Sequence, residues 1–189
     1  MKKYELTAEF IEKWGKKLFR IKALISFGSV EAGELGGYVE KEDNLAQDGD
    51  AWVYGNARVY GNAEVYGNAR VYGNAEVYGN ARVCDDAWVY GDAWVYGNAW
   101  VCGNADYLLI GRIGSRFSFT TFFKNKDKGI TVSCGCFLGT IAEFRAKVTD
   151  THGNNKHAKM YNLAADMAEL QILGEEHFDK LNTNKSEPF

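Results

Sequence analysis

"VYGNARVYGNAEVYGNARVYGNAEVYGNARV", residues 53–83, repeats one six-residue phrase in which a single position alternates between Arg and Glu. Ala and Val lie two positions apart in the phrase, so on a short strand both side chains point to the same side. Gly-Asn follows as a turn, because both residues tolerate a positive φ angle. Each hexad therefore predicts a short strand and a corner. Ten hexads run through residues 49–108: GDAWVY, GNARVY, GNAEVY, GNARVY, GNAEVY, GNARVC, DDAWVY, GDAWVY, GNAWVC and GNADYL.

Three hexads make a triangular coil of eighteen residues, and successive coils stack about 4.8 Å apart, as neighbouring strands do. Residues eighteen positions apart then lie above each other, which places Arg58 on Glu76 and Glu64 on Arg82. Opposite charges of this kind contribute about 0.2–1 kcal/mol per cross-strand pair. The alternation therefore has a structural reason. The same spacing predicts columns of asparagines: Asn56 and Asn74, and Asn62, Asn80 and Asn98.

This pattern resembles that of the hexapeptide-repeat proteins, which fold as left-handed parallel β-helices. Their repeat is an aliphatic residue, two or three turn-compatible residues and a small residue, as in Val-Tyr-Gly-Asn-Ala-Glu at residues 59–64. The resemblance covers about a third of the chain and implies a mainly β fold with about three to four coils. A right-handed β-helix or an amyloid-like stack is the alternative, which the strict period of six disfavours.

The chain divides around this repeat. Residues 1–48 predict one or two strands that lead into an imperfect first coil, and such an atypical unit caps the open edge of a stack. Residues 49–108 form the β-helix, residues 109–173 form a small α+β domain with a hairpin and two helices, and residues 174–189 form a polar, frayed tail.

The α+β domain begins with a hairpin. One strand places Phe117, Phe119, Thr121 and Phe123 on one face, and the returning strand contributes Ile130, Val132 and Cys134. A capping box at residues 140–143 then opens a short helix that reaches about Val148. The second helix has two adjacent apolar stripes, which we expect to be mostly buried against the hairpin: Met160, Leu163, Met167 and Leu170, and Tyr161, Ala165, Ala168 and Ile172.

Composition limits the partners and the compartment. The net charge of −3 and pI near 5.7 lack the basic footprint of a general nucleic-acid binder and give no attraction to anionic membranes. Charged residues interrupt the N-terminal apolar positions, so we expect no signal peptide, and no apolar run reaches the length of a membrane span. We therefore expect the cytosol.

Residues that carry chemistry are sparse. β-Helix acyltransferases usually use a histidine base in or beside the coils, and a γ-type carbonic anhydrase holds zinc with several histidines, yet residues 49–108 contain none. His152 and His157 are five positions apart, which does not place them on one helical face, so they are a weak candidate for a polar site. We expect no catalytic residue, no metal and no cofactor.

The four cysteines form two pairs. Cys84 and Cys102 stand in one column, where their Cα atoms lie within disulfide reach. Because we expect a reducing compartment, we interpret them as free thiols that replace the Tyr66 of that column. Cys134 and Cys136 place two thiols on one strand face, but a metal site there would need a second matched pair.

The outward positions hold the interface candidates. Trp88, Trp94 and Trp100 occur in successive hexads, so one lies on each face of a single coil, and Trp52 shares a column with Arg70 and Trp88. Outward indoles are either covered by the terminal segments or form an interface with a subunit or partner. Arg58, Arg70 and Arg82 are the charged candidates. The family resemblance implies a homo-oligomer, with a trimer favoured.

The layout of the whole chain gives a second resemblance. "GELGGYVEKEDNLAQDGDAWVYGNA" (residues 33–57) and "GCFLGTIAEFRAKVTDTHGNNKHAKMY" (residues 135–161) resemble uncharacterised proteins of bacteriophages, prophages and related mobile elements. This implies a non-catalytic binding protein in the host bacterial cytosol that inhibits a host defence factor, such as a CRISPR nuclease, or sequesters a nucleotide signal between subunits. The alternatives are a hexapeptide-repeat acyltransferase that uses His152 or His157, and a structural polymer of end-to-end coils.

Overall fold

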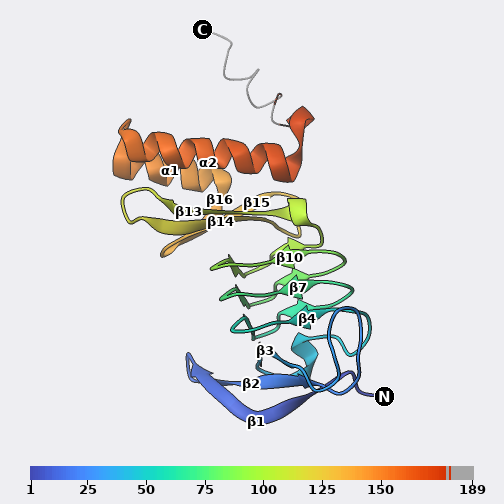
Figure 1. Cartoon of the computed structure of the whole chain (residues 1–189). Helices are drawn as coiled ribbons and strands as arrows, with labels where there is room; N and C mark the ends of the chain where they lie inside the picture. Colours follow the sequence, from blue (N-terminus) through green and yellow to red (C-terminus); the bar gives the residue numbers. More distant parts are fainter. Residues whose placement is uncertain (178, 180–189) are drawn as a thin grey trace. The chain divides into compact units, whose positions relative to one another are not determined.

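The computed structural model describes residues 1–177 and residue 179. The chain forms two compact units, Met1–Asn104 and a second unit that begins at Ala105 (Figure 1). The first unit is a β-solenoid of about four turns with an N-terminal cap. The second combines a small antiparallel sheet with two helices. The predicted fold class, a mainly β chain with a β-helix and a small α+β domain, is confirmed.

Nine two-residue strands build the repeats of the solenoid. They fall into three parallel sheets, one on each side of the coil, in the orders β5-β8-β11, β4-β7-β10 and β6-β9-β12. Every pair is eighteen residues apart, so the predicted register is confirmed. The strands are β4 (Trp52–Val53), β5 (Arg58–Val59), β6 (Glu64–Val65), β7 (Arg70–Val71), β8 (Glu76–Val77), β9 (Arg82–Val83), β10 (Trp88–Val89), β11 (Trp94–Val95) and β12 (Trp100–Val101).

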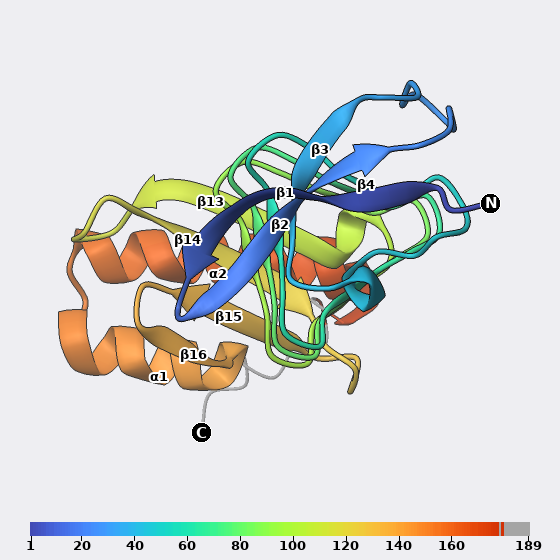
Figure 2. The same ribbon diagram turned by 90° about the horizontal axis from the view of Figure 1, so that it is seen from below.

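The interior of the solenoid consists of the Ala and Val of each hexad. All nine alanines from Ala51 to Ala99 and all nine valines from Val53 to Val101 are at most 2% exposed. The coils lie directly over one another in the view of Figure 2. Glycine is favoured at the corners: Gly73 has φ +74°, and a Cβ there would lie 3.0 Å from the backbone nitrogen of Gly91. The corner thus depends on both backbone freedom and the absence of a side chain.

The N-terminal cap is more elaborate than the sequence predicts. β1 (Tyr4–Lys13), β2 (Lys16–Ala23) and β3 (Leu35–Val39) pair antiparallel, and β3 then pairs in parallel with β5. The first coil is irregular, because Tyr38 pairs with Arg58, a separation of twenty residues rather than eighteen. The prediction of one or two strands missed β1, which has charged residues among its apolar positions.

Buried polar contacts close the capped end. The Lys3 ammonium donates to the carbonyls of Asp48, Gly49 and Ala51 at 3.2, 3.3 and 3.0 Å. The Tyr4 hydroxyl donates to Leu45 O at 2.7 Å, at the end of the short 3-10 helix η1 (Glu42–Asn44). These bonds satisfy carbonyls that have no coil beneath them.

The second unit is a four-stranded antiparallel meander with two helices on one face (Figure 1). Its shared core includes Phe122, Val132, Phe144 and Tyr161. The capping box of Thr140 and Glu143 is present, but the first helix runs four residues beyond the predicted end at Val148. The elements are β13 (Tyr107–Ile113), β14 (Ser118–Lys124), β15 (Ile130–Cys134), β16 (Phe137–Thr140), α1 (Ile141–His152) and α2 (Lys156–Leu173), with η2 (Asn104–Asp106) at the junction of the units.

Several details of this unit differ from the predictions. The expected hairpin is the middle of a four-stranded sheet, and the side of it that packs on the helices carries Phe122, paired with Val132. Phe117 lies in the β13–β14 turn with φ 47° and is 72% exposed. The tenth hexad, residues 103–108, is not a coil, because η2 interrupts it and β13 begins at Tyr107.

Two further predictions, for the buried face of α2 and for the C-terminal tail, also need correction. Of the two apolar stripes of α2, only the Tyr161 stripe is buried; Met160, Leu163, Met167 and Leu170 are exposed, because the sheet and α1 cover one side of the helix. Residues 175–177 are helical rather than frayed. The rest of the predicted polar tail, residue 178 and residues 180–189, lies outside the described residues.

Candidate functional site

The predicted Arg–Glu pairs of the solenoid are both present. One pair is largely buried and the other is exposed to solvent. Glu76 is 5% exposed, and its carboxylate accepts from Lys13 at 2.7 Å, Arg58 at 3.2 Å and the Tyr60 hydroxyl at 3.1 Å. Burial and the neighbouring Glu76 carboxylate raise the pKa of Tyr60 well above its usual value. This network holds the β1–β2 hairpin against the second coil, so Arg58 has a structural role rather than a free surface.

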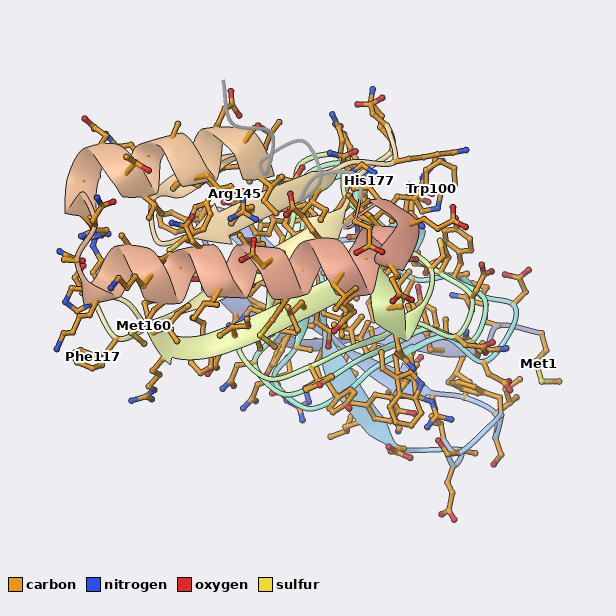
Figure 3. The ribbon with its side chains drawn as sticks, turned by 90° about the horizontal axis from the view of Figure 1, so that it is seen from above. Met1, Trp100, Phe117, Arg145, Met160 and His177 are labelled. Atoms are coloured by element: carbon orange, nitrogen blue, oxygen red, sulfur yellow. A yellow bond between two sulfur atoms is a disulfide. The ribbon has the colours of Figure 1, made fainter. Side chains whose placement is uncertain are left out.

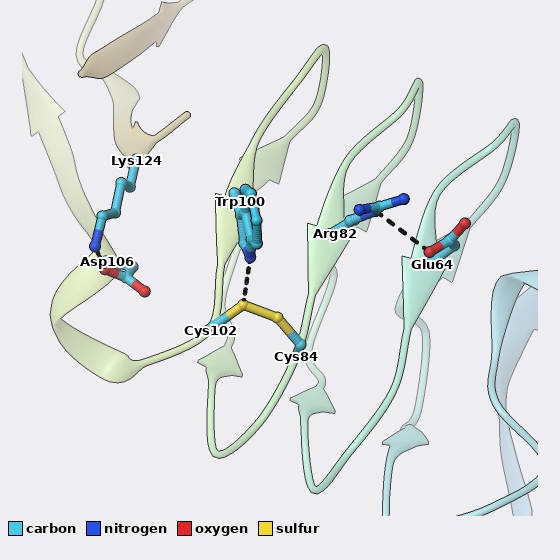
Figure 4. Close-up of a disulfide and its surroundings, with 7 residues drawn as sticks. All are labelled: Glu64, Arg82, Cys84, Trp100, Cys102, Asp106 and Lys124. Carbon is cyan, nitrogen blue, oxygen red and sulfur yellow. Dashed lines mark hydrogen bonds and ion pairs between the residues drawn. A yellow bond between two sulfur atoms is a disulfide. The ribbon is translucent and has the colours of Figure 1, made fainter. Parts of the chain in front are cut away.

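The second charged pair is solvated. Arg82 Nε lies 3.4 Å from Glu64 Oε2, and both side chains are about half exposed, at 51% and 48% (Figure 4). Such pairs contribute about 0–1 kcal/mol. Arg82 therefore remains available to a partner, unlike Arg58. The asparagine column is also present, with Asn62 donating to Asn80 at 3.2 Å.

Three of the four predicted indoles are exposed. Trp88, Trp94 and Trp100, which we call the indole girdle, are 43%, 40% and 43% exposed and lie on β10, β11 and β12, one in each sheet of the solenoid. The Arg70 guanidinium lies 5.2 Å from the Trp88 ring centroid, a cation–π distance. The girdle is thus distributed around the coil rather than gathered on one face.

Trp52 was an interface candidate, and the structure contradicts this. Its indole is fully buried, with Tyr4 at 6.0 Å and Phe27 at 5.4 Å in edge-on contacts from the N-terminal cap. The sequence left open whether terminal segments cover the outward indoles. For Trp52 they do, because the cap folds over the first regular strand.

Tyrosines stack along the corners. Tyr60, Tyr78 and Tyr96 form a ladder with ring centroids 4.9 and 4.6 Å apart and nearly parallel planes. In the neighbouring column Tyr66 is followed by Cys84 and Cys102, whose Cα atoms are 4.4 Å apart and whose sulfurs form a disulfide (Figure 4). The predicted stacking of the two cysteines is confirmed, but the interpretation as free thiols, which rested on the expected compartment, is wrong for this pair.

The disulfide has two polar neighbours. Trp100 Nε1 donates to Cys102 Sγ at 2.8 Å, and Asp85 occupies a corner usually held by glycine, with φ 51°. The ligand atoms of Cys84, Asp85 and Cys102 lie within 4.8 Å of one another. While the disulfide is closed, the sulfurs are not available as thiolate ligands.

A pocket of about 260 Å³ in the second unit is lined by several side chains with reactive or titratable groups. Tyr161, Phe144 and Val148 contribute apolar walls, and the thiols of Cys134 and Cys136 also line it. Cys136 belongs to the turn after β15, so the two cysteines do not share a strand face as predicted, although they share this pocket. Two cationic side chains, Arg116 and Lys147, and the imidazole of His152 also line the pocket.

His152 and His157 meet in the structure. His152 ends α1 and His157 begins α2, and their ring centroids are 5.8 Å apart. His152 also stacks on Tyr161 at 5.8 Å. Burial and the adjacent Cys134 thiol raise the pKa of Tyr161 to about 12, so its phenol stays protonated at neutral pH. As predicted, the two histidines do not share one helical face; the turn between α1 and α2 brings their rings together instead.

In the described part of the chain, no helix is both long enough and apolar enough to cross a membrane. Comparison with curated proteins gives no match. Residues 51–65, 63–79 and 75–91 match the family model described as the YdcK beta-solenoid repeat. These segments include β4 to β10, so this part of the chain is similar in sequence to a β-solenoid repeat, the fold that it adopts.

Proposed function

We propose that this chain is a non-catalytic binding protein whose solenoid presents the indole girdle to a protein partner. The carrying observation is the exposure of three indoles, at 40–43%, in sheets whose other repeat strands present mostly Arg and Glu at the outward position. Burial of an indole is strongly favourable, so an exposed indole gains free energy when a partner covers it. Trp and Arg are also the residues that contribute most to the binding energy of protein interfaces. The solenoid holds them on a rigid backbone, so binding requires little ordering.

The proposed partner is a bacterial host factor. The resemblance of the sequence to phage and prophage proteins supports a defence protein such as a CRISPR nuclease, and the host cytosol as the location. We propose a homotrimer as the working assembly, following the resemblance to hexapeptide-repeat proteins. Sequestration of a nucleotide signal between subunits is a variant of the same proposal.

The test is partner capture by girdle variants. The tagged protein is used to capture a partner from a bacterial lysate, and binding of the purified partner is then measured for Trp88→Ala, Trp94→Ala and Trp100→Ala. Trp14→Ala, which removes a 79% exposed indole from the β1–β2 turn, is the matched control. We expect at least a tenfold loss for one girdle variant and none for the control.

The pattern among the variants locates the partner. Loss in one variant assigns the partner to one sheet of the solenoid, whereas equal loss in all three indicates a partner that surrounds the coil. Wild-type binding by all three variants would reject the girdle as the binding surface.

A second candidate is acyl transfer, because His152 lines a pocket with Cys134 and Cys136. Turnover of acyl-CoA donors that disappears in His152→Ala, with an unchanged thermal midpoint, would favour this enzyme over the binding protein. His157→Ala is the control from the same pair of rings. A structural polymer would instead show a mass in solution that grows without limit with concentration.

A further inference from the structure

One face of α2 is apolar and open. Met160, Leu163, Met167 and Leu170, which we call the α2 stripe, are 39%, 64%, 57% and 46% exposed. Their spacing of three, four and three residues is that of the a and d positions of a coiled coil, which pack against a second helix. Met160 marks the N-terminal end of the stripe on the helix nearest the viewer in Figure 3.

A different face of α2 forms the contacts that hold the helix in the second unit. Tyr161, Ala165 and Ala168 are at most 5% exposed in the core against the sheet and α1. Arg145 of α1 lies 2.7 Å from Asp166 and 2.6 Å from Glu169, so one guanidinium bridges the two acidic groups in the middle of α2. The stripe is therefore not needed to fold the unit.

Charges at the two ends of the stripe have opposite signs. Lys156 and Lys159 are exposed in the first turn of α2, and Glu175 and Glu176 are exposed just after Gly174, which ends the helix. A parallel neighbour of the same sequence would place like charges together at both ends. An antiparallel neighbour would place opposite charges together at both ends.

We infer that the α2 stripe is the contact between two copies of this chain, whose α2 helices pack antiparallel across a twofold axis. Met160 then lies opposite Leu170 of the second copy, and Leu163 lies opposite Met167 of the second copy. Each layer pairs one Met with one Leu, so the layers have matched volumes. Lys156 faces Glu175 and Glu176 of the second copy.

This contact goes beyond the proposed function, because it uses the second unit and another copy rather than a host factor. A seam of four apolar side chains per copy is small for a specific interface and falls in the class of weak contacts that bury less than about 1,200 Å² in total. We therefore expect a dissociation constant of about 1 μM. Being isologous, the contact closes after two copies.

The first test measures mass by sedimentation or light scattering across concentrations that span this value. The double variant Leu163→Glu/Met167→Glu should halve the mass of the wild-type assembly, whether that assembly is a dimer or a pair of trimers. The matched control is Leu138→Glu, a 45% exposed leucine on β16 of the same unit, which should leave the mass unchanged. Helical circular dichroism confirms that each variant is folded.

The second test addresses orientation by exchanging charges. Lys156→Glu alone, and Glu175→Lys/Glu176→Lys alone, should each weaken association about two- to fivefold at low salt. Combining all three substitutions should restore it, because the exchanged charges meet only across the two copies.

Three results would overturn the inference. They are a wild-type mass equal to that of the Leu163→Glu/Met167→Glu variant, a Leu138→Glu variant that loses mass equally, or a combined charge exchange weaker than both of its parents. Girdle variants that lose the host partner but keep their mass separate a failure of this contact from a failure of the proposed function.

Discussion

The solenoid and the second unit bury their cores in different ways. In the solenoid, Val59 lies on Val77 and Val77 on Val95, so each layer has the same neighbours as the one before. In the second unit, Phe144 packs edge-on against Phe122 and Tyr161 and at a tilt of 53° against Phe137. Stability is therefore spread over equivalent layers in one unit and concentrated in a few large side chains in the other.

The chain carries separate reporters for this comparison. All five tryptophans lie in the first unit, and both named α-helices lie in the second. Tryptophan fluorescence therefore follows the solenoid, and circular dichroism at the helical band follows the second unit. Urea unfolding recorded with both signals resolves the two units in one sample.

The largest expected effect is that of Phe144→Ala. Removing this ring from a core where it is 3% exposed should destabilise the second unit by about 3–5 kcal/mol. We expect the circular dichroism midpoint to fall while the fluorescence midpoint stays. Val77→Ala, in the solenoid interior, should do the reverse. If Phe144→Ala moves both midpoints equally, the two units unfold as one and the comparison fails.

The next effect distinguishes the capped end of the solenoid from its repeats. Glu76→Gln leaves Lys13 and Arg58 without their shared buried carboxylate and should cost about 3 kcal/mol. Glu64→Gln removes the same group from the exposed pair with Arg82 and should cost less than about 1 kcal/mol. Fluorescence-detected urea unfolding measures both. Equal losses would mean that the cap contributes no more than any other layer.

A smaller effect tests the corners. Gly73→Ala adds a Cβ 3.0 Å from Gly91 N at a positive φ, whereas Gly97→Ala has the same kind of backbone and nothing within 4 Å. We expect about 2 kcal/mol for Gly73 and about 1 kcal/mol for Gly97, the latter from backbone strain alone. Identical thermal shifts would show that stacking between corners is not tight.

The smallest effect concerns Lys3. Burial lowers the pKa of Lys3 to about 8, whereas in the unfolded chain the pKa of this ammonium has its ordinary value of 10.5. Between these values the unfolded state binds more protons, so the stability of the solenoid should rise with pH, by at most about 1.4 kcal/mol per pH unit. Unfolding between about pH 7.5 and 9.5 measures the rise, below the range where unfolded tyrosines ionise.

The control for this pH dependence is Lys3→Met, which keeps the length of the side chain and removes its charge. Its stability should be flat across the same interval. A wild-type protein that is equally flat would mean that the Lys3 ammonium is not desolvated in the cap.

The repeats could be predicted because their contacts are periodic. A separation of eighteen residues is visible in the sequence, and it correctly places Arg58 on Glu76 and Cys84 beside Cys102. The chemical state of the two cysteines depends on more than register, and there the prediction was wrong. The period of the repeat determines where the two cysteines lie, but it does not determine whether their thiols are oxidised.

The cap and the second unit could not be predicted to the same degree. Contacts such as Tyr4 with Trp52 join distant segments that share no period. The apolar spacing of α2 identifies both of its stripes, yet only packing decides that the Tyr161 side is buried and the Leu163 side is open. His152 and His157 came together because a turn between helices reverses the chain, and spacing along one helix could not reveal that.

The fixed separation of eighteen residues also determines how the solenoid can form during synthesis. Lys3 and Tyr4 find their partners within residues 42–51, so the cap can close as soon as about fifty residues have emerged from the ribosome. From β7 onward, each strand pairs with the strand eighteen residues before it, which has already been synthesised. The register therefore allows vectorial growth, in which each new coil adds to the coil made before it and only the newest layer awaits a partner.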